Sequence, residues 1–135
     1  MNAVKALNHL GIAVRSIEAQ RPFYEGTLGA VFEGAEEVPD QKVRVGFFRV
    51  GDIRLELLEP TDPSSTVAAF LEKRGEGLHH VAYTVERLED RIAELKQGGV
   101  RMIDEAPRPG AHHTRIAFVH PKNTFGVLTE LCEPA

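Results

Sequence analysis

The stretch G-L-H-H-V-A-Y-T-V, residues 77–85, places two adjacent histidines at the start of a segment that has the composition of a β-strand. Successive side chains of a strand point to opposite faces of its sheet. Only His80 therefore shares a face with the small side chains of Ala82 and Thr84, which leave an open space beside its imidazole. His79 points the other way, and we expect it to be a packing or hydrogen-bonding residue.

A matching stretch lies near the N-terminus, where N-H-L-G-I-A-V occupies residues 8–14. Its histidine, His9, shares a strand face with Gly11 and Ala13, as His80 does with two small residues in the second stretch. A single histidine specifies no chemistry, because structural histidines are common. Two histidines in matching surroundings indicate an internal repeat.

The repeat extends well beyond the histidines. Each stretch is followed by a segment with helical spacing of apolar residues and then by three strand candidates. In the first half, the helix candidate at residues 15–28 has its apolar residues at Ile17, Phe23, Tyr24 and Leu28, and strand candidates follow at 30–38, 43–50 and 53–60. In the second half, the helix candidate at 86–97 precedes strand candidates at 100–105, 114–120 and 126–134.

These elements predict an α+β fold of two tandem βαβββ modules, which form a curved mixed sheet around a cleft. The modules span about residues 5–60 and 77–135 of a single domain, residues 1–135. The connector at 61–76 is predicted to be a turn and a short helix, with Thr66 or a neighbouring serine as its N-cap. Exposed edges of such small sheets favour pairing with a second copy, so we expect a homodimer.

A glutamate occupies equivalent positions at the far end of each module. Aligning L-E-L-L-E-P (55–60) with T-E-L-C-E-P (129–134) places Glu56 on Glu130. Two histidines and two glutamates at equivalent places form the set of nitrogen and oxygen donors that a divalent metal needs. This mixed set suits cobalt, nickel, manganese, iron or zinc better than calcium, and the sequence does not choose among them.

Composition excludes several other classes of protein. The chain has 135 residues, of which 42% are apolar and 27% charged, and its net charge of −4 comes with no basic stripe that would bind nucleic acid. No run approaches the roughly 20 apolar residues of a membrane-spanning helix, and residues 1–14 lack a secretory signal pattern. We therefore expect a cytoplasmic protein with no membrane role. The single cysteine, Cys132, is expected to be a small buried hydrophobe.

These modules resemble the vicinal oxygen chelate superfamily, and the closer match is the methylmalonyl-CoA epimerase family. The resemblance rests on L-N-H-L-G-I-A-V, F-Y-E-G-T-L-G-A, F-L-E-K-R-G-E-G-L-H-H-V-A-Y and R-P-G-A-H-H-T-R-I-A-F-V-H-P-K-N-T-F-G-V-L-T-E-L, which together run nearly end to end. It implies that His9, Glu56, His80 and Glu130 are metal ligands. It also implies interconversion of (R)- and (S)-methylmalonyl-CoA through a metal-stabilised enolate, with an acyl-CoA as the substrate.

Two departures from the family pattern concern the acids and bases. Some family members have Gln in place of Glu56 and carry an acidic residue where this chain has Val45. The resemblance therefore leaves the catalytic carboxylates to Glu56 and Glu130, each serving one face of the substrate. The third departure is His113, where the family often has glycine.

Substrate contacts are expected around the Gly/Pro-rich segment that precedes the strand at 114–120, because loops at a site rim often hold the non-reacting part of a ligand. The candidates are Arg108, His112, Arg115 and Lys122, and the three cationic residues among them are candidate contacts for phosphates of coenzyme A. Two other functions fit the same metal pattern or fold. One is a glyoxalase I type lactoylglutathione lyase, and the other is a metal-free small-molecule binding protein of the drug-resistance type.

Overall fold

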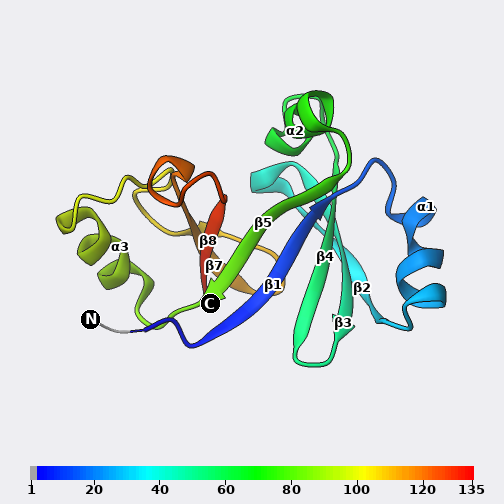
Figure 1. Cartoon of the computed structure of the whole chain (residues 1–135), viewed down its shortest axis with the longest axis horizontal. Coiled ribbons are helices and arrows are strands. Elements are labelled where there is room, and N and C mark those ends of the chain that lie inside the picture. Colours follow the sequence, from blue (N-terminus) through cyan, green and yellow to red (C-terminus); the bar gives the residue numbers. More distant parts are fainter. Residues whose placement is uncertain (1–2) are drawn as a thin grey trace. The chain divides into compact units, whose positions relative to one another are not determined.

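The computed structural model describes residues 3–135 (Figure 1). These residues form two compact units. One unit is His9–His79, and the other combines residues 3–8 with His80–Ala135. Residues 3–8, which the sequence pattern places in the first module, therefore belong to the unit that contains the second module. Each unit is described by itself below.

The unit His9–His79 contains a mixed four-stranded sheet in the order β2-β3-β4-β1. Strand β1 runs parallel to β4, whereas the pairs β2/β3 and β3/β4 are antiparallel. The elements are β1 (Ala6–Ala13), α1 (Ile17–Arg21), a π-helical turn (Pro22–Thr27), β2 (Val31–Val38), a 3₁₀ turn (Pro39–Gln41), β3 (Val43–Val50), β4 (Ile53–Pro60) and α2 (Thr66–Arg74).

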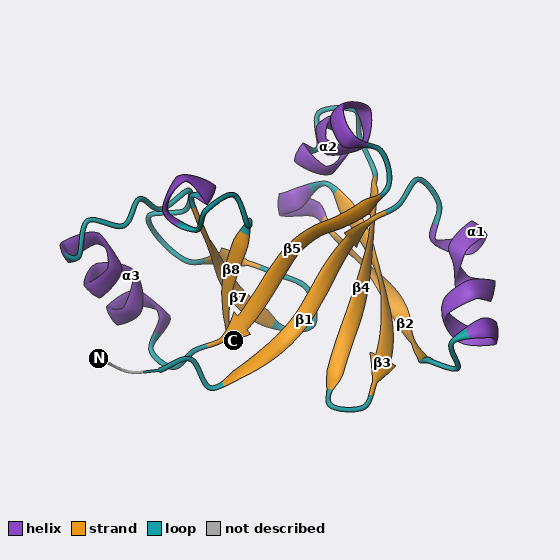
Figure 2. Cartoon of the chain, in the orientation of Figure 1, coloured by secondary structure: helices purple, strands orange, loops and turns teal. Residues whose placement is uncertain are grey.

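The second unit repeats this topology, with the strand order β5-β8-β7-β6. Here β5 runs parallel to β8, and the remaining pairs are antiparallel (Figure 2). Its elements are β5 (Gly77–Thr84), of which His80–Thr84 belong to this unit, α3 (Leu88–Gln97), β6 (Arg108–Pro109), β7 (Thr114–Val119), a 3₁₀ turn (Pro121–Asn123) and β8 (Thr129–Pro134). The predicted α+β class and the two βαβββ modules are confirmed.

One helix, α1 or α3, covers one face of each sheet. In the first unit Ile17 of α1 packs with Phe48 and Leu57, and all three are essentially inaccessible to solvent. In the second unit α3 presents Leu88 and Ile92 to a buried cluster that includes Leu131. Burying each large apolar side chain contributes about 1.5–3 kcal/mol. Glu56 and Glu130 are the sequence neighbours of two of these core leucines, so they point to the opposite faces.

A second pair of glutamates ties each helix to its sheet. Glu59 accepts a hydrogen bond from the backbone N–H of Ile17 at 2.8 Å, and Glu133 accepts one from Leu88 at 3.3 Å. A carboxylate at a helix N-terminus satisfies an otherwise unpaired donor and interacts favourably with the helix dipole. The motif E-x-x-E-P that ends β4 and β8 therefore serves both faces of each sheet.

Two local predictions were wrong. The strand expected at 100–105 is reduced to a single bridge between Met102 and Val119, because the Asp104 side chain accepts the N–H of Phe118 that a strand would use. The short strand β6 forms instead at Arg108–Pro109.

The apolar stripe expected at 15–28 is wrong in part, because only Ile17 and Tyr24 of its four residues pack in the core. Helix α1 ends at Arg21 and continues as a π-helical turn, so Phe23 and Leu28 are more than half exposed while Ile17 is buried. The capping prediction for α2 is confirmed, because the Ser65 hydroxyl accepts the N–H of Val67. None of the helices within residues 3–135 is long and apolar enough to span a membrane.

Candidate metal centre

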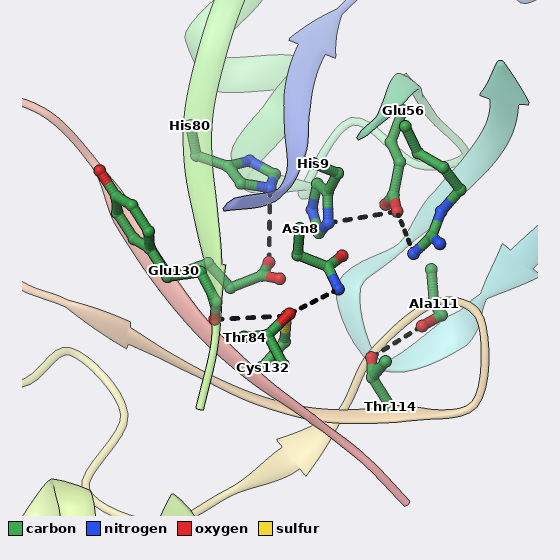
Figure 3. Close-up of polar contacts among 11 residues, drawn as sticks. Asn8, His9, Glu56, His80, Thr84, Ala111, Thr114, Glu130 and Cys132 are labelled. Atoms are coloured by element: carbon green, nitrogen blue, oxygen red, sulfur yellow. Dashed lines mark hydrogen bonds and ion pairs between the residues drawn. The ribbon is translucent and has the colours of Figure 1, made fainter. Parts of the chain in front are cut away.

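The first module brings His9 of β1 and Glu56 of β4 together. The parallel register pairs Gly11 with Glu56, so the histidine two residues earlier on the same face lies beside the carboxylate. The His9 Nδ1 atom is 3.3 Å from Glu56 Oε2, and both side chains are buried (Figure 3). A buried imidazole and a buried carboxylate in contact form one half of the predicted ligand set.

The second module repeats this arrangement with His80 of β5 and Glu130 of β8. The register pairs Ala82 with Glu130, which again places the histidine two residues before the paired position. The His80 Nε2 atom is 3.4 Å from Glu130 Oε1, and both side chains are buried (Figure 3). The predicted equivalence of the two His–Glu pairs is therefore seen residue by residue in the hydrogen-bonded registers.

The antiparallel neighbours of the two glutamates match as well. Phe47 of β3 is paired with Glu56, and Phe118 of β7 is paired with Glu130. The Phe118 ring packs edge-on against the His80 imidazole, with ring centroids 5.3 Å apart. An aromatic wall beside a metal-ligating histidine restricts solvent and fixes the ring orientation.

Each pair has the geometry of two adjacent ligands of one first-row metal ion. Two donors bonded at about 2.1 Å, with an angle between 90° and the tetrahedral value, lie about 3.0–3.5 Å apart. The observed separations of 3.3 and 3.4 Å fall in this range. Imidazole nitrogen and carboxylate oxygen are also the donor types that such ions accept, so the residues of each module fit a divalent cation.

The two pairs differ in their electrostatic surroundings. Arg54 donates a hydrogen bond from Nη2 to Glu56 Oε2 at 3.4 Å, whereas Leu128 occupies the equivalent position in the second module. Burial raises the pKa of Glu56 to about 7, against the opposing effect of Arg54, and the negative charge of Glu36 raises it further. A carboxyl group with a pKa near neutrality can both accept and donate a proton at physiological pH.

Glu36 is a site residue that was not predicted from the sequence. It lies in β2 and is paired with Val45 of β3, the position at which some family members carry an acidic residue. Paired residues of antiparallel strands point to the same face, so Glu36 lies on the face that carries Glu56. Alternation in V-F-E-G-A-E-E-V could not reveal this, because the register shifts between Phe32 and Ala35.

The four predicted substrate contacts lie in different surroundings. Arg115 lies three residues before Phe118 on β7 and therefore on the opposite face, where it forms ion pairs with Glu89 and Glu133 on the side of helix α3. The hydrogen bonds to Glu89 and Glu133 raise the pKa of the Arg115 guanidinium. Arg115 is therefore engaged in holding helix α3, away from the face of Glu130.

The other three candidates follow the loop and turn around β7. His112 adopts a left-handed backbone conformation with a φ of 59°, as does His113 with a φ of 55°, so the tip of the β6–β7 hairpin is strained. Lys122 is exposed in the 3₁₀ turn, where its backbone N–H bonds the imidazole of His120. Arg108, in β6, forms an ion pair with Asp104.

Two residues have the structural roles that the sequence predicts. His79 packs edge-on against Phe70, and burial lowers the pKa of its imidazole to about 4, so it stays neutral at physiological pH. Cys132 is 1% exposed and packs with Ala82 and Ile116.

Comparison with known proteins adds to this geometry. Residues 8–118 match the family model described as the glyoxalase/bleomycin resistance protein/dioxygenase superfamily. An uncharacterised protein of Bacillus subtilis (strain 168) is 49% identical over 95% of this chain and 91% of its own length. The ethylmalonyl-CoA/methylmalonyl-CoA epimerase of Cereibacter sphaeroides is 39% identical over 93% of this chain and 95% of its own length.

A solved structure described as methylmalonyl-CoA epimerase in complex with methylmalonyl-CoA and NH4+ superimposes with a TM-score of 0.93. It shares 36% sequence identity and covers 98% of this chain and 96% of that chain. The similarity therefore extends over nearly the whole chain, in fold and in sequence.

Proposed function

The chain belongs to the glyoxalase/bleomycin resistance protein/dioxygenase superfamily, and we propose that it is a metal-dependent epimerase that interconverts (R)- and (S)-methylmalonyl-CoA. The observation that carries the proposal is the pair of buried, register-equivalent His–Glu contacts, one in each module. The names of the relatives supply the substrate class, a CoA thioester with an acidic hydrogen between two carbonyl carbons.

The proposed metal ligands are His9, Glu56, His80 and Glu130. Their donor types suit cobalt, nickel, manganese, iron or zinc. Such an ion acts as a Lewis acid that favours the negative charge developing on a substrate oxygen when a neighbouring proton leaves. The protein's own contribution is a water-poor setting, because all four residues are at most 5% exposed.

Epimerisation requires that a proton leave C2 from one face and return on the other. We assign the two transfers to Glu56 and Glu130, because each is a buried carboxyl group at the equivalent place of its module. Each carboxylate would take the proton in one direction of the reaction and deliver it in the other. Arg54 holds the Glu56 carboxylate through its hydrogen bond and fixes its orientation.

The remaining features of the proposal are a homodimer and a cytoplasmic location. Strand β2 is the outer strand of its sheet, and edge strands favour pairing between copies. Bacterial relatives named as epimerases of CoA thioesters support a cytoplasmic location. Sedimentation at micromolar concentration tests the dimer, and a purely monomeric protein would contradict it.

The test of the activity uses NMR of methylmalonyl-CoA in D₂O. The protein, purified without a histidine tag and loaded with one divalent metal at a time, should exchange the C2 hydrogen of both enantiomers, and a chelator should abolish the exchange. Turnover of a glutathione hemithioacetal, without exchange of the C2 hydrogen of methylmalonyl-CoA, would indicate a lactoylglutathione lyase. Binding of small apolar compounds with no stoichiometric metal would point to a drug-binding protein, and either result overturns the proposal.

A further inference from the structure

Arg108 lies on the same face of the second module as the candidate ligands. Strand β6 pairs Arg108 with Ile116 of β7, and Ile116 is followed two residues later by Phe118. Phe118 is in turn paired with Glu130. Because paired residues of antiparallel strands share a face, as do residues two apart, the four side chains project to one side of the sheet.

One aromatic ring separates the guanidinium from a candidate ligand. The Arg108 Cζ atom is 5.8 Å from the centre of the Phe118 ring, and the same ring packs edge-on against His80. A cation within about 6 Å of a ring centroid is attracted by the ring. Phe118 therefore contacts both the Arg108 guanidinium and the His80 imidazole, which places the positive charge of Arg108 close to this candidate ligand.

Asp104 fixes the position of this guanidinium. Its Oδ1 atom forms an ion pair with Arg108 Nε at 2.9 Å, and its Oδ2 atom accepts the backbone N–H of Phe118 at 2.8 Å. The Asp104 side chain is 13% exposed, whereas that of Arg108 is 32% exposed. The carboxylate is thus anchored to the sheet, and the arginine that it holds reaches solvent.

The chemistry of the guanidinium identifies the class of ligand. It carries a permanent positive charge and a planar fork of N–H donors that matches the two oxygens of a carboxylate. Arginine in this setting suits a second carboxylate, which it recognises through two parallel hydrogen bonds. The proposed substrate carries such a group next to its reacting carbon.

We propose that Arg108 is a specificity-determining residue that binds the free carboxylate of a dicarboxylic acyl-CoA, and that Asp104 positions it. This inference rests on the proposed function. It replaces the expectation that Arg108 contacts phosphates of coenzyme A, because the long pantetheine chain separates the phosphates from the acyl group, and Arg108 lies one ring away from the proposed metal ligand His80.

Calorimetric binding of two ligands by the metal-loaded full chain tests the assignment. Malonyl-CoA has the free carboxylate, and propionyl-CoA has the same coenzyme without it. Arg108→Met should weaken malonyl-CoA binding about 10- to 100-fold, the range for a lost charged hydrogen bond, and leave propionyl-CoA within about twofold. The control is Arg101→Met, which makes the same charge change at an exposed arginine of the preceding segment and should alter neither ligand.

Different outcomes contradict different claims. If Arg108→Met weakens the binding of both ligands equally, Arg108 contacts the coenzyme and not the free carboxylate. If the binding of malonyl-CoA is unchanged, Arg108 does not contact the substrate. Arg108→Lys should restore part of the discrimination, and Asp104→Asn, which keeps an oxygen for the Phe118 N–H, should lose part of it. Suppose that the wild-type protein epimerises methylmalonyl-CoA and that Arg108→Met binds malonyl-CoA in preference to propionyl-CoA as strongly as the wild type does. In that case only this inference fails. A wild-type protein that neither binds nor exchanges acyl-CoA refutes the proposed function itself.

Discussion

Removing the charge of Glu56 should change how the stability of the metal-free protein depends on pH. Burial raises the pKa of this carboxyl group from 4.5 to about 7 in the folded protein. Between these two pH values the folded state holds a proton that the unfolded state has lost. Stability from this group is therefore fully present below pH 4.5 and is lost as the pH rises through 7.

The magnitude follows from the size of the shift. A difference of about 2.5 pKa units between the folded and unfolded states, at 1.36 kcal/mol per unit, corresponds to about 3 kcal/mol. Glu56→Gln is nearly isosteric and does not titrate. The variant should therefore become more stable than the wild type by a margin that grows by about 3 kcal/mol between about pH 4.5 and about pH 8.5.

Urea denaturation of chelator-treated protein at a series of pH values measures this margin. Glu133→Gln is a useful contrast, because Arg115 and the backbone of α3 lower the pKa of Glu133 and so oppose the effect of burial. That substitution should destabilise the protein most at neutral pH and progressively less in acid. If the stability curves of Glu56→Gln and the wild type run parallel from about pH 4.5 to about pH 8.5, Glu56 is not a buried carboxyl group with a raised pKa.

Two further outcomes follow from neighbouring contacts. Arg54→Met removes the group that lowers the pKa of Glu56, so the pH at which divalent metal binding is half-maximal should rise, as followed by metal titration at several pH values. Gly110→Ala would place a Cβ atom 2.6 Å from the Ile116 side chain, so unfolding in urea should show a loss of about 1–3 kcal/mol, the typical cost of overpacking.

The fold and both His–Glu pairs were predictable because they are duplicated. Alternation along a strand places each histidine relative to its small neighbours, and the repeat of E-x-x-E-P fixes the equivalent glutamates. Agreement between two independent copies of a weak pattern carries more information than either copy alone. The registers that pair Gly11 with Glu56 and Ala82 with Glu130 confirm the alignment.

What the repeat does not duplicate could not be predicted in the same way. The difference between Arg54 and Leu128, which sets the two glutamates apart, gains meaning only when the register places Arg54 beside Glu56. The strand expected at 100–105 failed because the side chain of Asp104 competes with the backbone for the N–H of Phe118. Competition between a side chain and the backbone is a tertiary effect that periodicity does not record.

The roles of the carboxylates should separate in single-turnover exchange of each methylmalonyl-CoA enantiomer in D₂O. If Glu56 and Glu130 each serve one face, Glu56→Gln and Glu130→Gln should keep an oxygen ligand and substantial metal, yet each should slow exchange from a different enantiomer by about 100-fold or more. His80→Ala should instead lose metal affinity and exchange together, because His80 is proposed to bind the metal and not to transfer a proton.

Glu36 provides the decisive contrast for this prediction. It lies on the face of Glu56, at the strand position opposite Val45, and its charge acts on the Glu56 carboxyl group. If Glu56 is the base, Glu36→Gln changes the pH dependence of exchange more than its maximum rate, since it removes only a neighbouring charge. Loss of exchange from one enantiomer in Glu36→Gln, together with wild-type exchange in Glu56→Gln, would reverse the assignment. Glu56 would then be a ligand only, and the proton would pass through the carboxylate that β2 contributes to this face.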